Sequence, residues 1–202
     1  VLWLKQQIWP LIRAQLPQAQ LHIYGAYPPP KATALHNERE GFLVKGWAED
    51  AHQVLQQARV CLAPLTFGAG LKGKLLDAMR CGTPSVTTEI GAEGMQSDAA
   101  WFGRIANSSQ QIAEAAVGLY LEPQWWQEAQ QQGYRLLQQK FAVSQHSARI
   151  WQQLEHVRMT LEQQRQTNFT GLMLRHHAHR STKFMGQWIE AKTRLAAFTQ
   201  PD

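Results

Sequence analysis

Two glycines, two lysines and an aspartate lie close together between residues 68 and 77. Gly68 and Gly70 fall in a predicted turn, and Lys72, Lys74 and Asp77 belong to the helix that this turn opens. Glycine lets the backbone approach a ligand closely, because no Cβ stands in the way. The N–H groups and the positive dipole end at a helix N-terminus attract phosphate or pyrophosphate. The spacing therefore predicts an anion-binding cradle with two added positive charges.

The aspartate adds a second kind of chemistry to this cradle. Asp77 lies one helical turn beyond Lys74, at the i, i+3 spacing that shares a helix face. A carboxylate there could accept hydrogen bonds from two hydroxyls of a ribose. An anion cradle beside a ribose acceptor, at the carboxyl end of a strand, indicates a nucleotide site. The stretch contains neither GxGxxG nor GxxxxGK[ST], so the alternative stays open that the glycines only make a tight turn and the lysines are solvated.

Strands alternating with helices must position these residues. The hydrophobic pattern predicts strands at 21–24, 41–47, 59–65 and 84–90 and a short fifth at 103–106. It predicts helices at 2–16, after Asp50 as N-cap, from 71 to 81 with Gly82 just past the end, and at 109–121, 123–140 and 145–163. Pro10 must kink or split the first helix, and the third strand is apolar enough to be buried on both faces. This order implies an α/β fold, a Rossmann-like parallel sheet with helices on both faces.

Composition narrows the class of protein. The chain has 202 residues, 44% of them hydrophobic, a formal net charge of +5 and only two cysteines. Two cysteines do not make a disulfide scaffold, and Cys61, in an apolar strand, is predicted to be a buried structural thiol. No stretch approaches the ~18–20 apolar residues of a spanning helix and no signal peptide is present, so we expect a cytoplasmic protein. Because Val1 already begins a predicted helix, we also expect further residues upstream.

The order of motifs adds a resemblance to a known family. IYG, VKGW, RVCLAPL and then G.G.K.KLLDAM..GTPSVTT..GAEGM resemble the C-terminal domain of group 1 (family 4-like) glycosyltransferases. The resemblance covers roughly residues 1–150, and the block 63–95 is its specific part. It implies the C-terminal half of a GT-B fold, in which two Rossmann-like domains face a cleft. In such enzymes the C-terminal domain binds the nucleotide sugar, and the N-terminal domain, expected here upstream of Val1, mainly binds the acceptor.

The resemblance also assigns donor-binding positions. Asp77 stands where the family has a Glu that contacts ribose, and Ala69 stands where many members have a second Glu near the donor sugar. Sugar recognition is therefore expected to run through the backbone of residues 67–71. Glu93 either faces the cleft or caps the following turn. The family's Arg/Lys pair on the diphosphate cannot be placed in this chain. The predicted donor-binding set is Gly25, Gly46, Trp47, Phe67, Gly68, Gly70, Leu71, Lys72, Lys74, Asp77 and Glu93.

These positions predict a glycosyltransferase that uses a nucleotide-diphosphate sugar and, as the resemblance implies, works without a metal or other cofactor. The positive cradle would stabilise the diphosphate leaving group as charge develops on it. No residue here is a candidate general base, so this chain alone is expected to bind donor without transferring sugar. Cell-surface polysaccharide synthesis of a bacterial type is the expected setting. The alternatives are a non-catalytic nucleotide-binding module, favoured by Ala69, and a GT-B sugar-nucleotide epimerase.

The C-terminal residues are predicted to form an extension. We place the nucleotide-sugar domain at 1–163 and a helical extension at 164–202, with a break at 164–168 and one basic amphipathic helix at 171–197. Docking of this helix on the rest of the enzyme is favoured over peripheral contact with the inner face of an anionic membrane. The HHAH run, with His176, His177 and His179, has poor spacing for a metal site. Trp125 and Trp126 are interpreted as helix packing, and no nucleic-acid partner is expected.

Overall fold

The computed structural model describes residues 1–96, 100–177 and 180–198, with backbone alone at 176–177 and 196–198. The chain divides into two compact units, Val1–Gln145 and His146–Asp202. This division precedes the boundary that we drew from the sequence between 163 and 164. No helix in the described part of the chain is both long and apolar enough to cross a membrane.

The described residues of the first unit form five parallel strands in two sheets. One sheet pairs β1 (Leu21–Tyr24) with β2 (Phe42–Gly46), and the other has the order β3–β4–β5, formed by Cys61–Ala63, Ser85–Thr87 and Gly103–Ile105. All five lie within the segments predicted from the sequence. Parallel neighbours need crossover connections, and helices supply most of them. The helices of this unit are η1 (Leu4–Ile8), α1 (Trp9–Gln15), α2 (Pro30–Thr33), α3 (Ala51–Gln57), α4 (Gly73–Arg80), α5 (Glu89–Ala92), α6 (Ser109–Leu121), α7 (Pro123–Leu136) and η2 (Leu137–Phe141).

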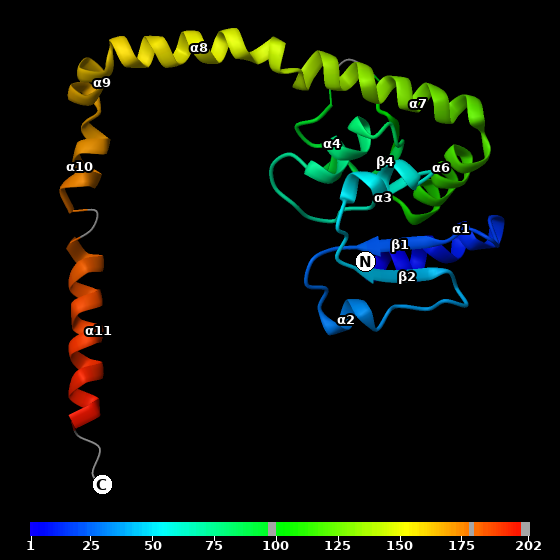
Figure 1. Ribbon diagram of the computed structural model, residues 1–202, viewed down its shortest axis with the longest axis horizontal. Helices are drawn as coiled ribbons and strands as arrows, with labels where there is room; N and C mark the ends of the chain where they lie inside the picture. The colour runs from blue at the N-terminus through cyan, green and yellow to red at the C-terminus, as the bar shows by residue number, and fades with distance from the viewer. Residues whose placement is uncertain (97–99, 178–179, 199–202) are drawn as a thin grey trace. The chain divides into compact units, whose positions relative to one another are not determined.

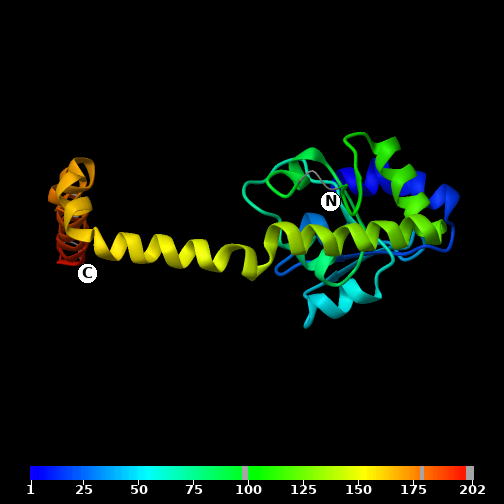
Figure 2. The ribbon, with the colours of Figure 1, turned by 90° about the horizontal axis from the view of Figure 1, so that it is seen from above.

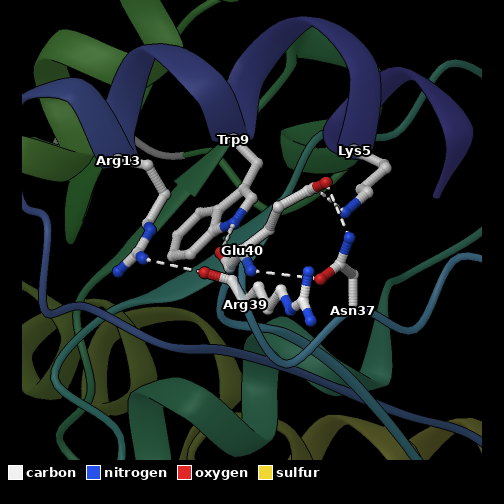
Figure 3. A network of polar contacts seen from close by, with 6 residues as sticks. All are labelled: Lys5, Trp9, Arg13, Asn37, Arg39 and Glu40. Atoms are coloured by element: carbon white, nitrogen blue, oxygen red, sulfur yellow. Dashed lines mark hydrogen bonds and ion pairs between the residues drawn. The ribbon is translucent and has the colours of Figure 1, made fainter.

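Pro10 divides the first predicted helix, as expected. The π-helical turn η1 runs into α1, where Pro10 occupies the second position and its missing N–H costs little. Side chains from η1 and α1 contact the loop that precedes β2 (Figure 3). Trp9 Nε1 donates to the Glu40 carbonyl at 2.7 Å, and Lys5 forms an ion pair with the Glu40 carboxylate. The amide of Asn37 donates to the same carboxylate at 2.7 Å. These contacts hold the helix against the β1–β2 sheet.

Two apolar clusters show that helices cover both faces of the strands. The larger cluster joins η1, α1 and α6 to Phe42 and Val86, so the two sheets share one core. The smaller cluster joins α4 and α7 to Ala63 and Phe102. Figure 1 shows α3 in front of the β3–β5 sheet, and Figure 2 shows the blue α1 beside the green α6 on one side and the cyan α3 on the other. The predicted α/β arrangement is confirmed.

Burial along the strands differs from the prediction at one point. The third strand was expected to be buried on both faces, but Cys61 and Leu62 in β3 keep partial exposure, whereas all three residues of β4 are buried. The reason is topological, because β4 lies between β3 and β5. Its polar side chains find partners: Thr87 Oγ1 donates to the Ala63 carbonyl at 2.8 Å, and Trp101 Nε1 donates to Ser85 Oγ at 3.2 Å.

The second unit is helical where it is described. It holds most of α8 (Val143–Met159), followed by α9 (Leu161–Thr167), α10 (Phe169–His177) and α11 (Arg180–Phe198). The break predicted at 164–168 is confirmed only at its end, because α9 runs to Thr167 and Asn168 follows it, and a second interruption lies at Thr160. Thr160 Oγ1 donates to the His156 carbonyl at 2.7 Å, and Asn168 Oδ1 accepts from the Gly171 backbone N–H at 2.8 Å, local bonds of the kind that compete with helix continuation. The single helix predicted at 171–197 is helical in its described parts, and residues 178–179 in its middle lie outside them.

Candidate functional site

The predicted anion cradle is a turn between β3 and α4. β3 ends at Ala63, and α4 begins at Gly73 after an irregular stretch of nine residues. Gly68 and Gly70 have φ of +153° and +66°, values that side chains with a Cβ rarely adopt. The turn therefore requires glycine at both positions. It lies at the carboxyl end of a parallel strand and at the N-terminus of a helix, the arrangement that the sequence predicted.

Lys72 and Lys74, expected to act alike, have different surroundings. Lys72 is only 6% exposed, and its Nζ donates to the Gly70 carbonyl at 2.7 Å. Lys74, in the first turn of α4, is exposed. The alternative in which both lysines are solvated is therefore wrong for Lys72, whose ammonium is tied to the backbone of the glycine turn. This places one positive charge inside the cradle, bonded to its backbone, and the other in solvent at its edge.

Glu93 lies against the same turn. Its Oε2 is 3.9 Å from Lys72 Nζ, and the side chain is 70% exposed. The next residue, Gly94, lies against the side chain of Leu71; a Cβ at position 94 would be 3.4 Å from Leu71 Cδ2. Glu93 ends the short helix α5, whose N-cap is Thr88. The fold thus brings the GAEGM segment onto the glycine turn, across twenty residues of sequence.

Asp77 has partners that the sequence reasoning did not anticipate. Its Oδ1 lies 3.3 Å from His52 Nε2 and 3.9 Å from Arg80 Nη1. Asp77 is partly buried, and His52 belongs to α3, which begins after the predicted N-cap Asp50. Asp50 accepts from the backbone N–H groups of His52 and Gln53, so the cap fixes the start of the helix that carries His52. His52 follows an Asp N-cap in the sequence, but nothing in the sequence pointed to a partner 25 residues away.

Gly25, Gly46 and Trp47 form a group at the carboxyl ends of β1 and β2. Gly25 N–H donates to the Gly46 carbonyl at 2.8 Å, extending the pairing of the two strands. Gly46 has φ of +77° and turns the chain out of β2. Trp47 follows with 68% of its surface exposed. A flat exposed aromatic ring at a strand end offers a surface on which a nucleobase can stack.

The rim of the cradle is apolar. Phe67 is 84% exposed and Leu71 is 51% exposed, one on each side of the two glycines. A hollow of about 350 Å³ lies elsewhere, beside β5, and is lined by Arg104, Glu114 and Trp125 among others. It contains none of the predicted donor-binding residues. Because Trp47, Phe67 and Lys74 are exposed, the predicted site lies on the surface of this unit.

Trp125 packs α7 against the core, as predicted, whereas Trp126 contacts Arg59 in the segment before β3. Trp125 lies against the larger apolar cluster, and Trp126 Nε1 donates to the Arg59 carbonyl at 2.7 Å while the Arg59 guanidinium lies 4.7 Å from the indole centroid. His179 and the side chains of His176 and His177 lie outside the described residues. Among the residues that are described, no group of three His, Cys, Asp or Glu side chains could hold a metal ion.

The surroundings of the two cysteines favour the protonated thiol. Both are free and partly buried. Burial raises the pKa of the Cys61 thiol to about 11, although Lys74 opposes the shift. Burial and then the negative charge of Asp77 raise the pKa of Cys81. Neither thiol has the lowered pKa that marks a nucleophile, which agrees with the interpretation of Cys61 as a structural residue.

The sequence profile of the family described as glycosyl transferases group 1 matches residues 1–122. This chain belongs to that family. The match covers more than half of the chain and includes every predicted donor-binding residue. No curated protein is matched by the chain.

Two solved structures show the same fold. The first is a S. aureus TarM mutant in complex with fondaparinux, alpha-GlcNAc-glycerol and UDP, at 17% identity and a TM-score of 0.60, with 70% of this chain and 30% of that chain covered. The second is the pneumococcal O-GlcNAc transferase GtfA in complex with UDP and GlcNAc, at 20% identity and a TM-score of 0.62, with 77% and 32% covered. This chain thus spans about a third of their length. The Rossmann-like half of a GT-B fold, expected from the sequence, is confirmed.

Proposed function

We propose that this chain is the donor-binding part of a glycosyltransferase and that the turn at 67–72 with the start of α4 holds the diphosphate of a nucleotide sugar. One observation carries the proposal. The buried ammonium of Lys72 is fixed to the backbone of a two-glycine turn at the N-terminus of α4. The hydrogen bond of Lys72 is to a neutral carbonyl, and its carboxylate neighbour, Glu93, lies 3.9 Å away with most of its surface in water, so a closer anion would still be stabilised by this buried charge.

The chemistry follows from this arrangement. When the bond between the sugar and the diphosphate breaks, negative charge builds up on the leaving diphosphate. The Lys72 ammonium, the α4 N-terminus and the more mobile Lys74 would stabilise that charge, and the fixed position of Lys72 requires little rearrangement during the reaction. This provides leaving-group stabilisation by the chain's own residues, without a metal ion. Asp77 would take the ribose hydroxyls, with His52 holding its carboxylate.

The nucleotide is proposed to be a uridine diphosphate. TarM and GtfA, which share the fold, are both described in complex with UDP. Uracil would lie toward Trp47, and the donor sugar would meet the backbone of 67–71 and the carboxylate of Glu93. We further propose that the whole enzyme acts in the cytoplasm in the synthesis of a cell-surface polysaccharide, with its acceptor held by another domain of the same polypeptide.

Thermal shift and calorimetry on this chain test the proposal. UDP at about 100 times its dissociation constant should stabilise the fold by about 2.7 kcal/mol. UDP should bind more tightly than uridine, because the cradle recognises the diphosphate. No stabilisation by UDP, GDP, ADP or CMP at millimolar concentration would refute it.

A non-catalytic nucleotide-binding module is the second candidate, because Ala69 replaces the acidic residue that many members place near the sugar. An activity assay on the complete polypeptide distinguishes a glycosyltransferase from a non-catalytic module. Incubation with a UDP-sugar and an acceptor should release UDP and yield a glycosylated product. Tight UDP-sugar binding without any product would favour the module, and an epimerised sugar would favour the epimerase.

A further inference from the structure

The helices at 169–198 carry most of the net positive charge of the chain. This segment holds five Lys or Arg residues and one acidic residue, Glu190, so it contributes +4 of the formal net charge of +5. The excess therefore lies outside the donor-binding unit and outside the residues that match the family profile.

One half of the circumference of α11 is apolar. At 100° per residue, Phe184, Leu195 and Trp188 fall within about 40° of one another, and Met185 and Ile189 continue the same side to about 140° from Phe184. Each of these five side chains is more than half exposed. The preceding helix α10 adds exposed apolar residues at i, i+3 and i+4: Phe169, Leu172 and Met173.

The other half of α11 is polar and cationic. Arg180, Lys183 and Arg194 lie on this side with Glu190, whose carboxylate Arg194 contacts at 2.6 Å. One further cation, Lys192, falls within the apolar half, and its Nζ lies 5.0 Å from the centroid of the Trp188 ring. A lysine whose stem runs along an aromatic ring can bury its methylenes in hydrocarbon while its ammonium reaches the headgroups.

We propose that 169–198 binds the surface of an anionic lipid bilayer, with α11 lying in the plane of the interface. The argument is charge complementarity on the same helix that carries the apolar face. A protein groove would cover the apolar half and leave the cationic half in water. At a bilayer surface the Phe184 and Trp188 side enters the acyl boundary, while the lysines and arginines around it meet negative headgroups.

Flotation of the 1–202 chain with vesicles tests this, and the result does not depend on nucleotide binding. The chain should bind vesicles of phosphatidylcholine with 30% phosphatidylglycerol, bind pure phosphatidylcholine far more weakly, and lose affinity between 50 and 500 mM salt because screening shortens the reach of surface charge. The double substitution Arg180→Gln/Lys183→Gln should lower the partition coefficient by about 30-fold. Each cation near the surface contributes ~1 kcal/mol, and a loss of about 1.4 kcal/mol lowers the coefficient tenfold.

Matched variants keep the test specific. Arg135→Gln/Arg149→Gln removes the same net charge from exposed positions on α7 and α8 and should leave the partition coefficient within about twofold. Phe184→Ser/Trp188→Ser should lower it on the order of 100-fold, whereas Ile150→Ser/Trp151→Ser, two exposed apolar residues on α8, should change it little.

Three outcomes would overturn the proposal: no flotation with anionic vesicles, equal flotation with neutral and anionic vesicles, or an equal effect of the two charge variants. Lipid-independent self-association that Phe184→Ser/Trp188→Ser abolishes, in the absence of vesicle binding, would assign this surface to a second copy of the chain. Helix content of the variants by circular dichroism ensures that lost flotation reflects lost binding.

Discussion

Lys72 offers the sharpest test of the proposed cradle. Its Nζ is held at 2.7 Å from the Gly70 carbonyl and its side chain is almost completely buried, whereas Lys74, two residues further on, is exposed. We compare Lys72→Met, which keeps the length and apolar character of the stem, with Lys74→Gln. Both remove one positive charge from the same turn, so the net charge of the two variants is equal.

The two variants should differ in diphosphate affinity. A charged hydrogen bond contributes about 1.5–3 kcal/mol, so Lys72→Met should weaken UDP binding by about 10- to 150-fold. Lys74 acts through solvent, where an ion pair contributes about 0.2–1 kcal/mol, so Lys74→Gln should weaken binding at most about fivefold. Uridine, which lacks the diphosphate, should bind both variants and the unmodified chain alike.

They should also differ in stability. Lys72→Met loses the bond that holds the glycine turn but also removes a buried charge, and the two effects oppose each other. We expect a net loss of about 1 kcal/mol, which lowers the melting temperature by about 2–4 °C in a domain of this size. Lys74→Gln should leave it unchanged. Titration calorimetry with UDP and uridine measures the affinities, and thermal denaturation measures the melting temperatures. If Lys72→Met binds UDP as well as the unmodified chain, or loses uridine affinity to the same degree, Lys72 does not hold a diphosphate.

Three further predictions concern neighbouring residues. Asp77→Asn should weaken UDP binding by about 10- to 150-fold with little loss of stability. His52→Ala should weaken UDP binding by a few-fold, because the Asp77 carboxylate loses the partner that orients it. If calorimetry shows unchanged UDP affinity in both variants, Asp77 has only a surface role. Glu93→Gln should raise UDP affinity by about two- to fivefold, because it removes a carboxylate near the cradle. It should lower the ratio of UDP-sugar affinity to UDP affinity, because the proposed contact between Glu93 and the sugar is lost. An unchanged ratio would exclude that contact. Because the pKa of Cys61 is raised from 9.0 to about 11 in the folded protein, the contribution of this thiol to stability is full below about pH 9 and is lost as the pH rises through 11. Urea denaturation of Cys61→Ala should therefore show a shallower fall in the free energy of unfolding between pH 9 and 11. An equally steep fall would contradict the raised pKa.

Local chemistry made much of the fold predictable. Asp50 caps α3, Pro10 divides the first helix, and Gly82 ends α4 with φ of +72° in a space where the Tyr134 hydroxyl leaves no room for a Cβ. Each is a signal read within a few residues, because caps and turns satisfy backbone groups nearby. The break predicted at 164–168 holds only at Asn168, because the QRQT run before it favours helix, and the interruption at Thr160 was not predicted.

The sequence alone determined the part of the proposed donor site that shares one segment: the two glycines that must adopt positive φ, the helix that follows them, and the charges at its N-cap and in its first two turns. Their spacing is fixed by covalent geometry, so no distant residue was needed to find them. Tertiary structure alone decided that Lys72 is buried while Lys74 is exposed, that Glu93 lies beside Lys72, and that His52 holds Asp77. Burial and pairing depend on which elements the parallel crossovers bring together, and one segment read by itself carries no information about the side chains that will pack against it.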